Sequence, residues 1–150
     1  MIIGLMAIIF CLDYYFRKDS DKPKKPSKFA SYFWPSLSGF TSFSIHAGGL
    51  PLSFYLLPMR LDRTMYVATA GLFYLLINLF KIFPYAYLGE MNFENIYTSL
   101  LLLPLAPLGV YFGAYLVDKI GQDWFYKIGY FCTLLAGCKL FYDGSIKLFL

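Results

Sequence analysis

The chain has 150 residues, of which 59% are hydrophobic and only 15% are charged. A soluble domain is usually about 45–50% apolar and about 25% charged, and a chain this short cannot bury so much apolar surface in one core. The formal charge of +4 does not indicate a nucleic-acid partner, because the basic residues are not spread along a polar face: six of the 13 fall in one stretch and the other seven are scattered. The composition therefore predicts an all-α integral membrane protein that lies in the lipid bilayer.

The N-terminal residues 1–16 form an apolar stretch that would be about 24 Å long as a helix. This is shorter than the hydrocarbon core of a bilayer, which is about 30 Å thick. No Lys or Arg precedes the stretch, whereas a secretory signal peptide has its positive charge first. We therefore expect a partial transmembrane helix at 1–16, and a chain that is a fragment or a half-length protein.

A basic segment follows, and residues 17–28 hold six of the 13 Lys and Arg residues. Under the positive-inside rule, such a cluster predicts a cytoplasmic loop. The rest of the chain, 29–150, is expected to form a membrane domain that corresponds to one repeat. Its apolar segments predict a helical bundle with about four to five transmembrane segments in all, at 1–16 and at about 33–58, 64–83, 96–117 and 124–142.

The 33–58 segment is interrupted by the sequence His46-Ala47-Gly48-Gly49-Leu50-Pro51. Two glycines followed by a proline are typical of a helix that stops and restarts. An unbroken helix over this segment would be about 39 Å long, which exceeds the membrane core. Because the N-terminus of a half-helix presents free N–H groups, the break predicts an anion site in a transporter. A kink that only aids packing is the alternative.

The orientation of the later segments depends on this break. If the 33–58 segment crosses the membrane, the turns at 59–63 and 118–123 lie outside and the loop at 84–95 lies inside. If it is re-entrant, every later segment has the opposite orientation. The sequence leaves both arrangements open.

Six residues are candidates for the substrate site. Four belong to the break and two share one face of the 64–83 segment: His46, Gly48, Gly49, Pro51, Asn78 and Lys81. For His46, a hydrogen bond to a neighbouring helix is the alternative. Lys81 lies near a helix end, where extension of its ammonium group to the interface is favoured, whereas Asn78 is expected to lie deeper.

Other patterns are interpreted as structural. Pro104 and Pro107 are expected to kink the 96–117 helix. Two stripes of small residues predict close helix packing: Gly109 with Gly113, and Gly129 with Thr133 and Gly137.

Nothing in the sequence indicates an enzyme. It has no phosphate-binding P-loop, no dinucleotide-binding glycine motif and no pair of nucleophile and base. Three cysteines without a Cys-x-x-Cys pair and a single histidine do not predict a metal site. We therefore expect no cofactor, and transport that is not powered by the chain's own ATP hydrolysis.

Between Ser38 and Gly144 an ordered set of motifs resembles the TauE/SafE (DUF81) family of sulfite exporters, also described as anion permeases. The motifs match the second half of that family in order and spacing: Gly39-Phe40, His46 to Pro51, Tyr55 to Pro58, Arg60 to Arg63, Ala68-Thr69, Asn78 to Lys81, Pro84-Tyr85, Leu88-Gly89, Pro104 to Gly109 and Gly137 to Leu140.

The resemblance implies a C-terminal half of a permease with about eight helices in two related halves. It implies a broken helix in each half, with the two breaks meeting at the substrate. The expected function is export of a small anion, such as sulfite or an organosulfonate, through the cell membrane and coupled to protons. The first half is absent, so a missing N-terminal half or a second copy of the chain is the expected partner. The histidine beside the break departs from the family pattern. A scaffold or accessory subunit without transport activity is the alternative function.

Overall fold

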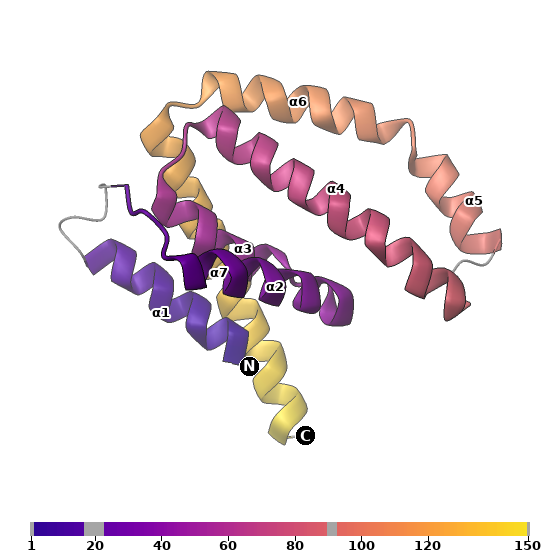
Figure 1. Ribbon diagram of the computed structural model, residues 1–150, viewed down its shortest axis with the longest axis horizontal. Coiled ribbons are helices and arrows are strands. Elements are labelled where there is room, and N and C mark those ends of the chain that lie inside the picture. The colour runs from indigo at the N-terminus through magenta and orange to yellow at the C-terminus, as the bar shows by residue number, and fades with distance from the viewer. Residues whose placement is uncertain (1, 17–22, 90–92, 150) are drawn as a thin grey trace. The chain divides into compact units, whose positions relative to one another are not determined.

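The computed structural model describes residues 2–16, 23–89 and 93–149, and every element in these ranges is a helix (Figure 1). The all-α prediction is therefore confirmed. Residues 17–22 of the predicted cytoplasmic loop and 90–92 of the predicted 84–95 loop lie outside the described residues. The helices are α1 (Ile2–Phe16), α2 (Lys28–Ile45), α3 (Gly49–Leu56), the 3₁₀ turn η1 (Leu57–Met59), α4 (Arg63–Tyr87), α5 (Phe93–Leu102), α6 (Leu105–Lys119) and α7 (Gln122–Phe149).

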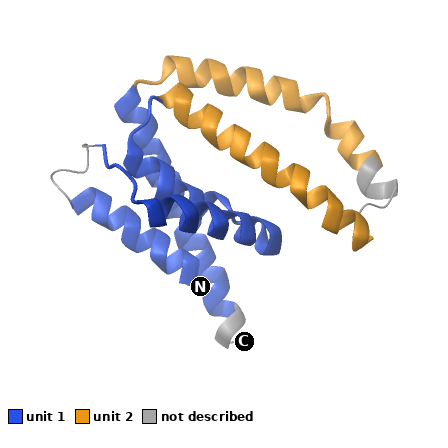
Figure 2. Ribbon diagram, in the orientation of Figure 1, with its two compact units in different colours: residues 1–62, 122–150 blue, residues 63–121 orange. Residues whose placement is uncertain are grey.

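The chain divides into two compact units (Figure 2). Unit 1 comprises residues 1–62 and 122–150, and unit 2 comprises residues 63–121 between them. The first and last helices of the chain therefore belong to the same unit, although more than a hundred residues separate them in sequence.

In unit 1, α1 and α7 pack closely in antiparallel directions. A Cβ atom at Gly4 would lie 2.6 Å from the carbonyl oxygen of Gly137, and one at Gly137 would lie 2.6 Å from the Cβ of Ala7. Further along the pair, the rings of Tyr14 and Tyr130 stack with centroids 3.6 Å apart. The predicted packing role of Gly137 is thus confirmed, because only glycine lets the two backbones approach this closely.

Helices α2 and α3 form a hairpin in unit 1. At its open end, the backbone N–H of Lys24 donates to the carbonyl of Pro58 over 2.9 Å. The hydroxyl of Tyr55 donates to Ser31 Oγ over 3.3 Å. The chain therefore returns after the break to the level at which α2 begins. This is the geometry of the re-entrant alternative, and it differs from a segment that crosses from one end to the other.

The turn that follows η1 is fixed to the start of α7. The side chains of Gln122 and Tyr126 both donate to the carbonyl of Leu61, over 2.7 and 2.6 Å. The described part of the basic segment, the 60–62 turn and the N-terminus of α7 consequently lie at one end of unit 1. Of the two arrangements that the sequence left open, these contacts match the re-entrant one, in which the described residues 23–28 and the 60–62 turn lie at the same end of unit 1.

Unit 2 contains the helices α4, α5 and α6. With 25 residues, α4 is the one described helix that is both long and apolar enough to cross a membrane by length and composition. Where one kinked helix was expected at 96–117, the structure has α5 and α6 separated at Leu103 and Pro104. Pro104 immediately precedes α6 and Pro107 lies in its first turn, where a missing N–H leaves no intrahelical bond unmade.

Among the described residues, the glycines of α6 are not in close contact with a neighbouring helix, unlike Gly137 of α7. A Cβ atom at Gly109 or Gly113 would meet no atom of the described chain within 4 Å. The predicted packing stripe of α6 therefore has no neighbouring helix within unit 2. At the ends of the unit, Arg63 donates to the carbonyl of Ile120, which holds the start of α4 beside the end of α6.

Candidate functional site

The closed end of the α2–α3 hairpin is here called the hairpin tip. It comprises the C-terminal part of α2 from Ser38, the break at 46–48 and the first turn of α3, and it brings together hydroxyl groups and a helix N-terminus. Ser38, Thr41 and Ser42 lie on one face of α2 because their spacing of three and four residues matches the helical period, and all three are buried. Ser38 Oγ donates to the carbonyl of Gly48 over 2.7 Å. The hydroxyl of Thr41 bonds back to the carbonyl of Leu37 over 2.8 Å. The tip is thus a buried polar cluster within unit 1.

His46 ends α2. It has a φ of 54° in the left-handed region, and its backbone N–H donates to the carbonyl of Thr41. Ala47 N–H donates to the same carbonyl over 3.2 Å. Glycine is the usual residue at such a helix end, and a left-handed conformation costs other residues about 1–2 kcal/mol. The imidazole of His46 is exposed.

The two glycines of the break have different environments. Gly48 is buried, and a Cβ atom there would lie 2.6 Å from the Cβ of Ser42 and 2.7 Å from the carbonyl oxygen of Ser38. Gly49 is the first residue of α3 and is exposed. Pro51 is buried as the third residue of α3. The close approach between the helices therefore depends on Gly48, whereas sequence alone did not distinguish it from Gly49.

The start of α3 faces this hydroxyl cluster. The first intrahelical bond runs from Leu52 N–H to the carbonyl of Gly48 over 3.3 Å. The N–H groups of the first turn precede that bond, and Pro51 contributes none. The partial positive charge of a helix N-terminus favours anions. The Ser38 and Thr41 hydroxyls already donate to backbone carbonyls. The hairpin tip can therefore offer the backbone N–H groups of the first turn of α3 to a small oxyanion without a full positive charge.

Asn78 and Lys81 lie on α4 in unit 2. Lys81 is only 9% exposed and Asn78 is exposed. How deep each of them lies in the membrane stays a prediction. That these two residues join the hairpin tip in one site stays a prediction.

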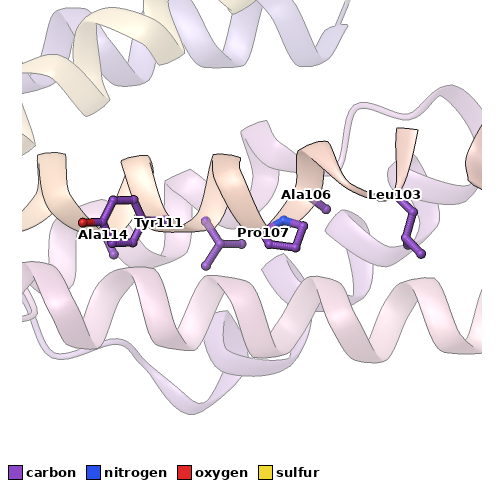
Figure 3. Close-up of a pocket in the computed structure, with 6 residues that line it drawn as sticks. Leu103, Ala106, Pro107, Tyr111 and Ala114 are labelled. Atoms are coloured by element: carbon purple, nitrogen blue, oxygen red, sulfur yellow. The ribbon is translucent and has the colours of Figure 1, made fainter. Parts of the chain in front are cut away.

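One cavity in the described chain has a volume of about 630 Å³ and follows one side of α6 (Figure 3). The Tyr111 hydroxyl is its one polar side-chain group, and no charged residue lines it. The lining residues are Leu103, Ala106, Pro107, Val110, Tyr111 and Ala114. A site with so few donors does not suit a small, strongly hydrated anion.

Arg60 was not singled out as a functional residue from the sequence. Its side chain is only 8% exposed and lies 3.8 Å from the carboxylate of Asp123. The guanidinium donates to the hydroxyl of Tyr14 over 3.2 Å and lies 4.8 Å from the ring centroid of Tyr126. No local pattern predicts this cluster, because its members come from α1, the 60–62 turn and α7.

We expect Arg60→Gln to lower the free energy of unfolding by about 2 kcal/mol, since it removes a charge-assisted hydrogen bond and a buried cation–π contact. Thermal unfolding of the detergent-purified protein, followed by circular dichroism, measures the loss. Lys119→Gln is the matched control, because Lys119 lies 5.3 Å from the Tyr115 ring but is exposed. Equal losses from both substitutions would contradict a structural role for the buried cluster.

The comparison with known families supports the resemblance. The model of the family described as sulfite exporter TauE/SafE matches residues 1–140. No curated protein and no solved structure gives a significant match. The matched range includes the hairpin tip, the Arg60 cluster and all of unit 2. The chain belongs to the sulfite exporter TauE/SafE family, a family of membrane transporters.

Proposed function

We propose that this protein exports a small anion, such as sulfite or an organosulfonate, across the cell membrane by secondary transport. The observation that carries the proposal is the hairpin tip, where the hydroxyl-bearing face of α2 meets the N-terminus of α3 at Gly48. Family membership supports anion transport as the general class.

The chemistry of the tip suits a transported ion. Backbone N–H donors at the start of α3 replace part of the hydration shell of an oxyanion. Because these donors carry only partial charges, the anion is held weakly enough to leave again, as conduction requires. We propose that the exposed imidazole of His46, next to the tip, exchanges the coupled proton. The partner in the complete transporter is an N-terminal half or a second copy of this chain, as the resemblance implies.

The re-entrant hairpin leads to one orientation. Residues 17–28, 60–63 and 119–127 hold ten of the 13 Lys and Arg residues, whereas residues 84–95 hold none. Within unit 1, the described parts of the first two segments lie at the same end as the start of α7. By the positive-inside rule, all three basic segments lie in the cytoplasm and the 84–95 loop lies outside. We therefore propose that the turns at 59–63 and 118–123 lie inside.

Cysteine labelling tests this orientation. Pro23→Cys and Asp62→Cys should both resist a membrane-impermeant maleimide added to intact cells, and both should react after the membrane is opened. Tyr87→Cys, at the far end of α4, should react in intact cells. All three variants are made in a protein in which Cys132 and Cys138 are replaced with Ala, since both cysteines are exposed on α7 and would react with the maleimide. Labelling of Asp62→Cys but not Pro23→Cys from outside would show that the hairpin crosses the membrane.

Efflux from cells tests the function. Deleting the gene from the host should slow the release of sulfite from sulfite-loaded cells, and restoring it should recover the rate. Parallel loading with an alkylsulfonate and with inorganic sulfate identifies the preferred anion. If the protein is a scaffold without transport activity, a folded variant with a disrupted hairpin tip will restore efflux as well as the native chain does. That result would overturn the proposal.

A further inference from the structure

A second cavity lies at the open end of the hairpin, opposite the tip. Its volume is about 190 Å³, and all of its lining residues belong to unit 1. Pockets for drug-sized ligands usually measure about 300–1,000 Å³, so this cavity suits a smaller molecule. It is here called the basal cavity.

The inner wall of the basal cavity is aromatic. Trp34 from α2 and Phe54 from α3 both line it, and their rings meet edge to face with centroids 5.2 Å apart. Tyr55 also lines the cavity, and its hydroxyl bonds to Ser31 on the opposite helix over 3.3 Å. An aromatic pair fixed in this way gives a rigid apolar surface.

The rim of the basal cavity is basic. Lys24 and Lys25 both line it, in the short segment that precedes α2. The backbone bond from Lys24 N–H to the carbonyl of Pro58, at 2.9 Å, anchors this segment to the end of α3. None of the lining residues is acidic, so no carboxylate in the cavity wall competes for the two ammonium groups.

We propose that the basal cavity binds an organic anion with a short apolar body, separately from the hairpin tip. The two lysines contact the anionic head and the aromatic wall covers the body. Such a ligand is either a soluble alkylsulfonate or the anionic head group and glycerol region of a bilayer lipid. The proposal that the transported anion binds here first, from the cytoplasm, rests on the proposed function. The existence of the binding site does not depend on that function.

Tryptophan fluorescence provides a local readout, because the chain has only two tryptophans. In a Trp124→Phe background, the emission of Trp34 reports directly on the cavity that it lines. The full-length variant is placed in nanodiscs of neutral phosphatidylcholine and titrated with butanesulfonate. Inorganic sulfate at matched ionic strength is the control ligand, since it has the charge without the apolar body.

We expect saturable quenching by butanesulfonate and none by sulfate. Lys24→Gln and Lys25→Gln should each weaken the apparent affinity about fivefold, as for partly exposed ion pairs. Lys28→Gln removes the same charge from the neighbouring helix start but does not line the cavity, and it should change the affinity less than about twofold. Circular dichroism verifies that the variants remain folded. Absent quenching, or equal weakening by Lys28→Gln, would overturn the site.

The lipid composition of the nanodiscs distinguishes a lipid ligand from a soluble alkylsulfonate. In nanodiscs that contain phosphatidylglycerol, a lipid ligand would shift Trp34 emission before any titration and block butanesulfonate, and this shift would also require Lys24 and Lys25. Efflux from the same variants separates this proposal from the proposed function. Binding without efflux in the native chain overturns the transport function alone, and efflux without binding overturns this site alone.

Discussion

Replacing Gly48 with alanine is expected to reduce anion efflux by at least about tenfold. The new methyl group would lie 2.6 Å from the Cβ of Ser42 and 2.7 Å from the carbonyl oxygen of Ser38, so α3 must move away from α2. That movement would stretch the 2.7 Å bond from Ser38 Oγ to the Gly48 carbonyl and displace the first turn of α3. Displacements of about 1 Å in a binding site can cost a hundredfold in rate. Sulfite release from loaded cells measures the effect.

Gly49→Ala is the matched control, one residue away. Gly49 is exposed at the first position of α3, whereas Gly48 is buried, so we expect an added methyl group to be better tolerated at Gly49. Alanine is also the better helix former. We therefore expect near-normal efflux, with membrane levels of both variants compared by immunoblot. Loss of efflux in Gly49→Ala but not in Gly48→Ala would show that the anion approaches the exposed side of the break.

Gly4→Leu is expected to lower the free energy of unfolding by about 3 kcal/mol, the upper part of the usual range for overpacking. Even a Cβ atom at Gly4 would lie 2.5 Å from the backbone nitrogen of Phe141 and 2.6 Å from the carbonyl oxygen of Gly137. Backbone atoms cannot rotate away as a flexible side chain can, so α1 and α7 must separate. Thermal unfolding in detergent, followed by circular dichroism, measures the loss.

The control for this substitution is Gly71→Leu on α4. A Cβ atom at Gly71 meets nothing within 4 Å, and leucine has the higher helix propensity. The variant should unfold at the same temperature as the native protein or slightly above it. A large loss from Gly71→Leu would indicate that this face of α4 is covered in the assembled protein.

Sequence predicted the helical class and the position of the break because both depend on local signals. Long apolar segments must form helices in a bilayer, and a Gly-Gly-x-Pro pattern ends one helix and begins the next. The direction of the chain after the break was not predictable, since it depends on contacts such as Lys24 with Pro58 that join distant residues. The separation of α5 from α6 was missed because Pro104 and Pro107 fit a kink and a helix start equally well.

The candidate site was predicted in part. The break itself was found, but the roles of Gly48 and Gly49 differ only through the neighbouring helix, which sequence does not show. Ser38, Thr41 and Ser42 had a usable signal, namely three small hydroxyl residues on one helical face. Arg60 had none, because its tyrosine partners are 46 and 66 positions away: 60 − 14 and 126 − 60.

The division of unit 1 between the two ends of the sequence has a consequence for biosynthesis. The ribosome releases α1, α2 and α3 well before α7, with the whole of unit 2 made in between. Among the described residues, the backbone that Gly4 of α1 packs against belongs to α7, at Gly137 and Phe141. Lipid or the insertion machinery must therefore shield the early helices during translation. α4 is the one described helix that is suited by itself to partition into the bilayer. It therefore anchors the nascent chain until α7 is made and can pack against α1.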